Sequence, residues 1–406
     1  MKKILFILYT CCILLFPVSA QQIPSFKAND RIVFLGNSIT EGGHYHSYIW
    51  LYYMTHFPEL PLRIYNGGIG GDCASHMVFR FDSDIKIKKP TYLVCSFGMN
   101  DSGYDGYNKP GYDKYANKQV EYANTEFGKL QQQILADKKI KNVVLLGSSP
   151  YDENVKLEGV ETLHGKNETI KRIIEMQAEV AQKRGWGFVN FNTVMCELNK
   201  EIQQSDSTAT FCGGDRIHPD KDGHMVMAYL FLKAQGLAGK EVAYFHINAT
   251  NRKAMEERNC RITHIKNEND TISFSYLSRS LPFPVDTIPR WGTKGTARDA
   301  VRQVPFMQEM NQEIMKVTDL HGNFRVTIDG TEIGRWDGNE LSKGINLAEI
   351  TCTPQYQQSL SIMYLNEERC AIEKRLRQYM AMQYVFFKHR GLLFADNKAA
   401  LDAAKA

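Results

Sequence analysis

The chain has 406 residues, of which 43% are hydrophobic, 11% aromatic and 23% charged, a composition typical of globular proteins. This argues against a disordered, collagen-like or coiled-coil chain, and a chain of this length can bury a large core without disulfide bonds. Basic residues number 49 and acidic residues 45, so the net charge is +4 at pH 7. That balance, with no dense run of Lys and Arg, argues against nucleic acid as a partner.

The first twenty residues have the three-part layout of a secretory signal peptide. Lys2 and Lys3 precede an apolar run over 4–17, and residues 18–20 are the small residues that a signal peptidase requires. We predict cleavage after Ala20 and a secreted or periplasmic protein. A membrane anchor is the alternative, but the apolar run is shorter than the roughly 20 residues that span a bilayer. We therefore expect no stable membrane insertion.

After the predicted cleavage site, short apolar runs alternate with longer amphipathic runs. The predicted elements, in chain order, are a strand at 31–36, a helix at 47–57, a strand at 62–65, a helix at 74–88, a strand at 92–96, a helix at 120–138, a strand at 143–146, a helix at 166–184, a strand at 187–191 and a helix at 222–235. This order predicts an α/β fold with a doubly wound parallel sheet. In such folds the chemistry collects at the carboxyl ends of the strands.

The pattern changes after about residue 239. Strand-like alternation occurs at 243–247, 261–265 and 271–276, a Pro-rich stretch covers 281–289, the segment 297–317 is predicted to be mostly helical, a strand at 324–328 leads into the turn pair Asp329-Gly330, and 354–388 is predicted to be helical. We therefore divide the mature chain into a domain over residues 21–239 and a mixed α+β carboxyl-terminal extension over 240–406 with no assigned role.

Four short motifs follow strand ends or lie in an equivalent loop. They are Gly36-Asn37-Ser38, the glycine-rich segment 66–72 that contains Gly71, the segment 98–101 that contains Asn100, and the segment 215–219 that begins Asp215-Arg216-Ile217-His218. Taken singly, each is commonly a turn or a capped helix. Their joint occurrence in this order, at the edge where the strands end, indicates an active site.

The motifs together supply the parts of a serine hydrolase. Ser38 is the candidate nucleophile, His218 the base that activates it, and Asp215 the acid that orients the imidazole. The backbone amides of Ser38 and Gly71 and the side-chain amide of Asn100 are the candidate oxyanion donors.

On these residues the chain resembles the SGNH hydrolases, the GDSL esterase and lipase family, over roughly residues 30–238. Ser38, Gly71, Asn100 and His218 fall on the four residues that give the family its name, and Asp215 falls on the triad acid. The resemblance implies a flavodoxin-like five-stranded sheet, ester hydrolysis through an acyl-serine, and no metal or organic cofactor. Asn37 stands where the family usually has Asp, so the hydrogen bonding around Ser38 is expected to differ.

Aromatic side chains near the motifs suggest the substrate. Tyr104 and Tyr107 could stack on sugar rings and His44 could line the cleft, although local packing would explain each of them as well. The absence of a long apolar stretch near the site favours a small acyl group on a polar carrier. We therefore predict an acylated small molecule or glycan as substrate and a carbohydrate O-acetylesterase as the function. A lysophospholipase, arylesterase or thioesterase, or a non-catalytic glycan-binding module, are the alternatives.

The cysteine pattern is not that of a disulfide framework. Seven cysteines follow the predicted signal peptide, an odd number at wide spacings. Cys196 and Cys212 could pair in an oxidising compartment, and the sequence leaves this open, as it does the oligomeric state. His44 and His46 have no carboxylate cluster beside them, so we expect no metal site.

Overall fold

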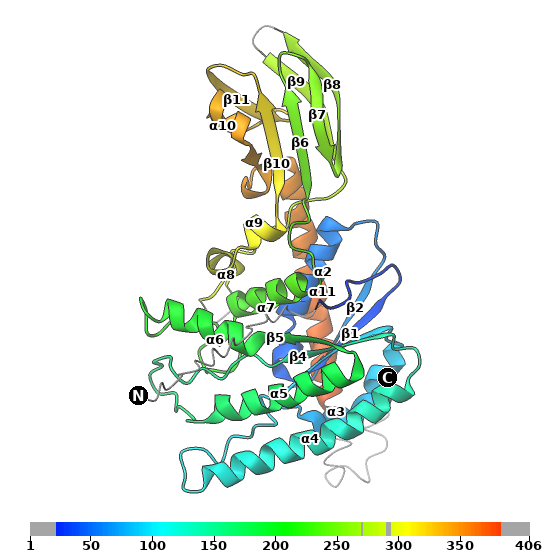
Figure 1. Ribbon diagram of the computed structural model, residues 1–406, viewed down its shortest axis with the longest axis vertical. Helices are drawn as coiled ribbons and strands as arrows, with labels where there is room; N and C mark the ends of the chain where they lie inside the picture. The colour runs from blue at the N-terminus through cyan, green and yellow to red at the C-terminus, as the bar shows by residue number, and fades with distance from the viewer. Residues whose placement is uncertain (1–21, 269–270, 290–293, 383–406) are drawn as a thin grey trace, which may run out of the picture.

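The computed structural model describes residues 22–268, 271–289 and 294–382 (Figure 1). The predicted signal peptide therefore lies outside the described residues. Among the described residues, five parallel strands form the larger sheet, in the order β2-β1-β3-β4-β5. They are β1 (Arg31–Gly36), β2 (Arg63–Gly68), β3 (Tyr92–Phe97), β4 (Asn142–Gly147) and β5 (Gly187–Asn190). This confirms the predicted α/β, flavodoxin-like fold.

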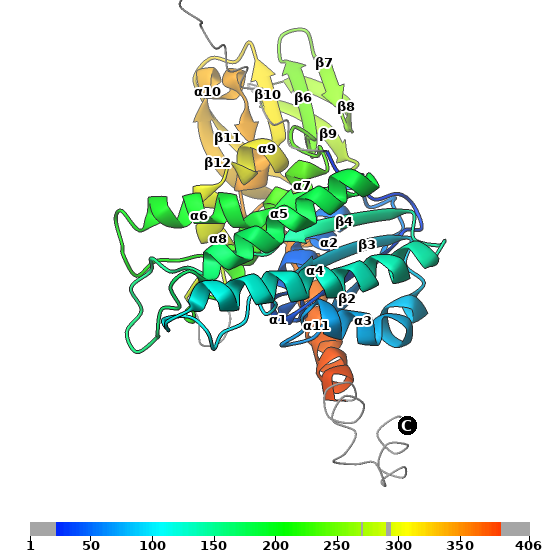
Figure 2. The ribbon, with the colours of Figure 1, turned by 60° about the horizontal axis from the view of Figure 1, so that its bottom comes forward.

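Helices cover both faces of this sheet (Figure 2). One face packs against α2 (His44–His56), α6 (Phe191–Ile202) and α7 (Lys221–Ala234), and the other against α3 (Ala74–Arg80), α4 (Tyr112–Ala136) and α5 (Lys166–Arg184). Residues 32–35 of β1 are fully buried, as expected for a central strand whose side chains pack into the core on both faces. The helix α6 was not predicted.

In the part of the chain up to residue 239, two predicted elements end three or more residues away from the predicted position. The strand predicted at 62–65 continues to Gly68 as β2, because glycine fits where a Cβ at position 68 would lie 2.1 Å from the backbone nitrogen of Glu41. The helix predicted at 74–88 ends as α3 at Arg80 and continues as a π-helical turn, Phe81–Ile85, and a 3-10 turn, Lys86–Lys88. In this arrangement Asp84 faces Arg80 in the interior.

The carboxyl-terminal part forms smaller sheets. In the described chain, β6 (Ala243–Asn248), β7 (Lys253–Arg258), β10 (Glu313–Thr318) and β13 (Ile345–Asn346) form one sheet, and two hairpins pair β8 (Cys260–Glu268) with β9 (Thr271–Ser278) and β11 (Asn323–Ile328) with β12 (Thr331–Asp337). The hairpin around Asp329-Gly330 is as predicted. The three short helices here are α8 (Ala297–Gln303), α9 (Phe306–Met310) and α10 (Gly338–Lys343).

The prediction of a mostly helical segment over 297–317 is wrong beyond Met310. Pro305 follows α8, and a proline cannot continue a helix interior. The next segment, β10, alternates buried and half-buried side chains with a period of two, as a strand does.

A long final helix returns to the first sheet. The helix α11 (Pro354–Ala381) begins beside the second sheet and runs along α2 to the edge strand β2 (Figures 1 and 2). The side chain of Met363 joins the hydrophobic core that α2 and α7 form against the larger sheet, and Asn366 Nδ2 donates to Ser47 O at 3.1 Å. The last turn of this prediction, 383–388, lies outside the described residues. Within the described ranges, no helix has the length and apolar character that a membrane span needs.

Candidate active site

Ser38 stands at the end of β1, on the sheet edge where chemistry was expected. It is the first residue of α1 (Ser38–Gly42). Asn37 caps this helix, since its Oδ1 accepts a hydrogen bond from Ile39 N at 3.0 Å and its side chain is buried. Gly36 permits the tight turn, because a Cβ there would lie 2.0 Å from Thr40 Oγ1. Asn37 thus supplies the helix cap through a neutral acceptor.

Ser38, His218 and Asp215 form one hydrogen-bonded chain. Ser38 Oγ lies 2.8 Å from His218 Nε2, and His218 Nδ1 lies 2.5 Å from Asp215 Oδ2. Because an ionised carboxylate can only accept, Nδ1 carries the proton of the neutral ring and Nε2 accepts from the Ser38 hydroxyl. Asp215 Oδ1 also accepts from the backbone N–H groups of Ile217 and His218, at 3.0 and 2.8 Å. The carboxylate and the ring are therefore held in one relative orientation.

The carboxyl of Asp215 is tuned to stay ionised. Burial alone would raise its pKa, but the hydrogen bonds from the side chain and backbone of His218 and from Ile217, with the electrostatic attraction of the His218 side chain, outweigh this effect and hold the pKa below its ordinary value. A charged carboxylate at this position could stabilise an imidazolium if the His218 ring took up a proton. The side chains of His218 and Asp215 are 42% and 49% exposed, so solvent and a ligand can reach them.

The glycine-rich loop after β2 lies beside Ser38. Gly70 N–H donates to Glu41 Oε2 at 2.6 Å, which ties the loop to α1. Gly71 has a φ of +81°, and no atom lies within 4 Å of the place where its Cβ would be. A left-handed residue facing open space suits glycine, and it leaves the backbone accessible to a ligand.

Asn100 is connected to that loop. Its Nδ2 donates to Asp72 O at 3.0 Å. The next residue, Asp101, accepts from Ala74 N at 2.8 Å and from Gly98 N at 2.9 Å. The loops after β2 and β3 are therefore joined by hydrogen bonds, and the Asn100 amide keeps a second N–H for a ligand. The structure thus joins Ser38, His218 and Asp215 directly by hydrogen bonds, and it joins the loop of Asn100 to the loop of Gly71, which is itself tied through Glu41 to the helix that begins at Ser38.

We expect Asn100→Ala to lower kcat by about 10²–10³-fold with the fold intact, because it would remove one of the three candidate oxyanion donors. Hydrolysis of p-nitrophenyl acetate under saturating conditions measures this loss. Asn124→Ala, at an exposed position of α4, is the control and should keep wild-type turnover. A wild-type kcat in Asn100→Ala would exclude an oxyanion role for this amide.

The three residues predicted for substrate contact have different surroundings. His44 begins α2 and is half-buried. Tyr104 is half-buried, and its hydroxyl donates to Asn100 Oδ1 at 2.8 Å. Tyr107 is only 2% exposed, and its hydroxyl donates to a backbone carbonyl. The ring of Tyr107 is thus packed inside the protein, and a sugar could reach only His44 and Tyr104.

A buried charge network below the site was not predicted. Arg80 donates to Asp72 Oδ2 at 2.6 Å and to Asp84 Oδ2 at 2.5 Å. It also donates to the carbonyl oxygens of Gly36 and Gly67, at 3.2 and 2.7 Å. Arg80 therefore joins the ends of β1 and β2, from which the Ser38 turn and the glycine-rich loop continue.

The final helix contributes to the same network. Arg377 of α11 makes two hydrogen bonds of 2.8 Å to Asp84 and donates to Gly68 O at 2.9 Å. Glu373 Oε1 accepts from Asn66 N at 2.7 Å. The carboxyl-terminal extension thus holds the edge strand that leads into the Gly71 loop. One pattern in the sequence could have pointed to this role. The residues that α11 buries are spaced by three, four or seven positions, as on one face of a helix, and the last of them is an arginine: Tyr356, Ser359, Met363, Asn366, Cys370 and Arg377.

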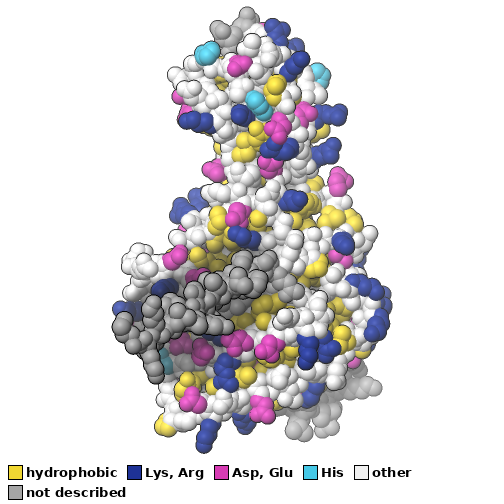
Figure 3. All heavy atoms as spheres, in the orientation of Figure 1, with side chains coloured by type: hydrophobic (Ala, Val, Ile, Leu, Met, Phe, Trp, Pro, Cys, Tyr) yellow, Lys and Arg dark blue, Asp and Glu magenta, His cyan; other side chains and the backbone are white. Residues whose placement is uncertain are grey.

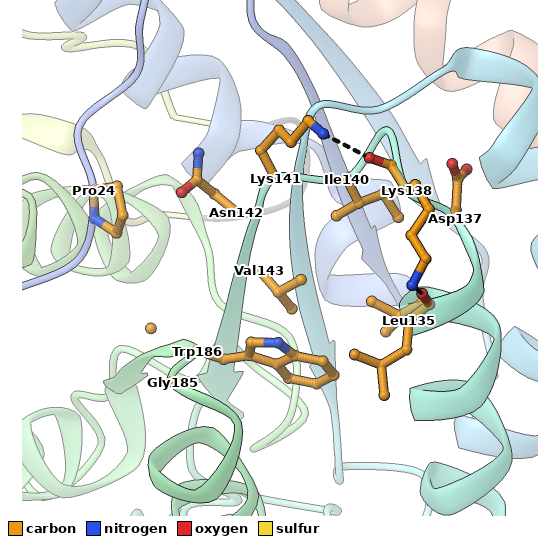
Figure 4. Close-up of a pocket in the computed structure, with 12 residues that line it drawn as sticks. Pro24, Leu135, Asp137, Lys138, Ile140, Lys141, Asn142, Val143, Gly185 and Trp186 are labelled. Atoms are coloured by element: carbon orange, nitrogen blue, oxygen red, sulfur yellow. Dashed lines mark hydrogen bonds between the residues drawn. The ribbon is translucent and has the colours of Figure 1, made fainter.

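Two hollows in the described part of the chain can be compared with the position of the candidate active site. One hollow, of about 390 Å³, is lined by Trp186 and by side chains between Ile134 and Val143 (Figure 4). It lies at the amino ends of β4 and β5, whereas Ser38 lies at the carboxyl end of β1. There Lys141 Nζ donates to Lys138 O at 2.8 Å. The other, of about 590 Å³, is open and lined by the loop 153–162 and Arg216, next to Asp215 in the chain. The first hollow is thus remote from the candidate active site.

The described residues show no grouping of side chains that points to a metal cofactor. Within the described residues, no group of three or more His, Cys, Asp or Glu side chains could hold a metal ion. Cys196 and Cys212 are both free thiols. On the face drawn in Figure 3, acidic and basic side chains are intermixed.

Comparison with known proteins shows similarity to a solved structure over nearly the full length of the chain. A family profile described as GDSL-like Lipase/Acylhydrolase matches residues 34–226, and one described as Diltiazem deacetylase C-terminal helical domain matches 360–406. A solved structure, a gut microbial diltiazem-metabolizing enzyme, is 50% identical, covers 95% of this chain and 87% of that chain, and superimposes with a TM-score of 0.91.

A second relative is more distant. An acetylxylan esterase of Geobacillus stearothermophilus is 22% identical over 224 residues, which are 52% of this chain and 95% of that protein. A solved acetylxylan esterase structure from the same organism is 20% identical, covers 52% of this chain and 96% of that chain, and has a TM-score of 0.41.

Proposed function

Because this chain belongs to the GDSL-like lipase/acylhydrolase family of ester hydrolases, we propose that it removes acetyl groups from O-acetyl esters, with Ser38 as nucleophile. The observation that carries this proposal is the unbroken chain of hydrogen bonds from Ser38 Oγ through His218 to Asp215. That geometry matches the nucleophile, base and orienting acid of serine hydrolases.

In the first half of the reaction, His218 Nε2 takes the Ser38 proton as Oγ attacks the ester carbonyl. The developing oxyanion accepts hydrogen bonds from the Asn100 side chain and from the backbone N–H groups of Gly71 and Ser38. His218 then gives the proton to the departing alcohol oxygen, and acetyl-Ser38 remains. In the second half, water attacks this ester as His218 takes a proton from the water, and His218 then gives that proton to Ser38 Oγ as the bond between Oγ and the acyl carbon breaks. Acetic acid leaves and ionises to acetate, and the Ser38 hydroxyl and the neutral His218 ring are restored.

A short acyl group is favoured by the surroundings of the site. Long acyl tails need extensive apolar surface. In the part of the chain that the structure describes, large hydrophobic side chains that are exposed lie on α3, α4, α11 and the carboxyl-terminal sheets, among other places, and none lies within the four motifs. Of the two neighbours of Ser38 in the chain, Asn37 is polar, and the apolar side chain of Ile39 is buried in the core and not exposed to a ligand.

For the alcohol half, we propose a carbohydrate as the first candidate, since Tyr104 and His44 are half-buried and offer polar atoms and ring edges. A second candidate is favoured by the relative of nearly full length, which metabolises diltiazem and shares the carboxyl-terminal part as well as the hydrolase domain. An acetyl ester of a drug-like polycyclic alcohol is therefore the alternative substrate.

The acyl preference is tested with p-nitrophenyl acetate, butyrate and octanoate, using wild type and Ser38→Ala. We expect hydrolysis of acetate to exceed that of octanoate by at least about tenfold in kcat/KM, and to depend on Ser38. A preference for octanoate would contradict the acetylesterase proposal and favour a lysophospholipase or thioesterase.

The alcohol half is tested by acetate release from acetylated xylo-oligosaccharides and from diltiazem at equal ester concentration. The substrate with the higher kcat/KM identifies the class. Release from neither, with p-nitrophenyl acetate still hydrolysed, would exclude both candidates and keep the esterase chemistry.

We also propose that the enzyme is secreted or periplasmic, on the basis of residues 1–20 alone. Amino-terminal sequencing of the protein from its native host should begin at Gln21. A start at Met1 or Lys2 would contradict this proposal.

A further inference from the structure

A buried lysine lies behind the oxyanion donor. Lys166, the first residue of α5, is fully buried. Its Nζ donates to Met99 O at 2.9 Å, to Ser102 Oγ at 2.6 Å and to Gly103 O at 2.6 Å. An ammonium has three donors, and here all three go to the segment that carries Asn100.

This placement is costly for a group with only a packing role. Burying an ammonium is unfavourable unless its hydrogen bonds are made, and the amino terminus of a helix disfavours a positive charge. Burial lowers the pKa of Lys166 to about 7, while the neighbouring Asp101 opposes that shift. The three acceptors favour the charged form, because a neutral amine would leave one of them without a donor.

Tyr104 connects this lysine to Asn100. Lys166 Nζ lies 3.7 Å from the centre of the Tyr104 ring, a close cation–π contact. The Tyr104 hydroxyl donates to Asn100 Oδ1 at 2.8 Å. A cation against the ring draws electron density from it, so the hydroxyl becomes a stronger donor, and such chains of polar contacts reinforce one another.

The same contacts fix the orientation of the Asn100 amide. The carbonyl of Asp72 can only accept, so it must face Nδ2, which lies 3.0 Å away. The Tyr104 hydroxyl then faces Oδ1. With both ends held, the second N–H of Nδ2 has one direction, and a stronger hydrogen bond at Oδ1 makes that N–H a better donor.

We propose that Lys166 and Tyr104 are positioning residues for the oxyanion site: the buried ammonium holds the segment 99–103 and the Tyr104 ring, and the Tyr104 hydroxyl orients and polarises the Asn100 amide. This inference rests on the proposed role of Asn100 in ester hydrolysis.

The test is a double-mutant cycle on the full-length enzyme with p-nitrophenyl acetate. We expect Tyr104→Phe to lower kcat about tenfold with KM changed less than about twofold, the effect of losing one orienting hydrogen bond. In the Asn100→Ala background, the same substitution should lower kcat less than about twofold, because the group it orients is gone. Tyr122→Phe, at an exposed position of α4, is the matched control and should keep wild-type kcat.

Lys166→Met is a second test of the inference, measured as kcat in the wild-type and Asn100→Ala backgrounds. Far-UV circular dichroism checks that the variant is folded. The substitution should lower kcat at least about tenfold in the wild-type background and less than about threefold in Asn100→Ala. If this variant does not fold, the Tyr104→Phe cycle decides alone.

Two results would overturn this inference and leave the proposed ester hydrolysis standing. One is an unchanged kcat in Tyr104→Phe while kcat is lowered in Asn100→Ala. The other is an equal fold-loss of kcat from Tyr104→Phe in the wild-type and Asn100→Ala backgrounds. A wild-type kcat in Asn100→Ala would instead refute the oxyanion role, and this inference with it.

Discussion

Ser38→Ala is expected to lower kcat for p-nitrophenyl acetate by at least about 10⁴-fold, because it removes the hydroxyl that we propose accepts the acyl group. The Ser38 hydroxyl makes a hydrogen bond to His218 but fills little core volume. The melting temperature should therefore stay close to the wild-type value. Turnover and thermal unfolding, measured on the same preparation, separate loss of chemistry from loss of fold.

Ser205→Ala is the matched control for this substitution. Ser205 lies in an exposed turn after α6, and its hydroxyl donates only to a backbone carbonyl within that turn. We expect wild-type kcat in this variant. Wild-type turnover in Ser38→Ala would exclude the serine mechanism.

Arg377→Met is expected to destabilise the protein by about 3 kcal/mol, because it removes two charge-assisted hydrogen bonds to the buried Asp84 and one to Gly68 O. It should also lower kcat about tenfold or more, since Gly68 leads into the Gly71 loop and small displacements of catalytic groups are costly. Urea unfolding and p-nitrophenyl acetate hydrolysis measure the two effects. Arg375→Met, an exposed position on the same helix, should change neither.

The acid dependence of stability gives a further reading of Arg377→Met. Burial alone would raise the pKa of Asp84, but Arg377, Arg80 and Lys88 outweigh it and hold the pKa far below its ordinary value. A carboxyl with a depressed folded-state pKa stabilises the fold fully above its unfolded pKa of about 4, and this stabilisation is lost as the pH falls below that value. In Arg377→Met the folded-state pKa of Asp84 rises, because one of the cations that lower it is removed. Ionised Asp84 then contributes less to stability at pH 7, so acidification removes less. The free energy of unfolding should then differ from wild type by more at pH 7 than at pH 3. An equal difference at both pH values would show that Arg377 acts through packing alone.

The sheet was predictable because its strands are buried on both faces. A short continuous apolar run such as residues 32–35 is typical of a strand that packs into the core on both faces, and glycines and polar residues mark where such a run ends. The candidate site residues could be placed at one edge of the sheet from the sequence, since the four motifs that contain them follow the ends of parallel strands.

The carboxyl-terminal part was less predictable because its structure depends on distant contacts. The segment 313–317 has apolar residues that suit a helix or a strand, and pairing with β6 decides for the strand. Asp84 and Arg377 are 293 residues apart in the chain, so no local pattern relates them. The π-helical turn at Phe81–Ile85 belongs to this same buried network.

The most direct test of the central claim is to treat the full-length protein with a fluorophosphonate probe and to locate the modified residue by peptide mass spectrometry. We predict a single modified residue, Ser38, with labelling abolished in Ser38→Ala and strongly slowed in His218→Ala. Labelling at another residue, or no labelling of a preparation that still hydrolyses p-nitrophenyl acetate, would contradict the assignment of Ser38 as the nucleophile.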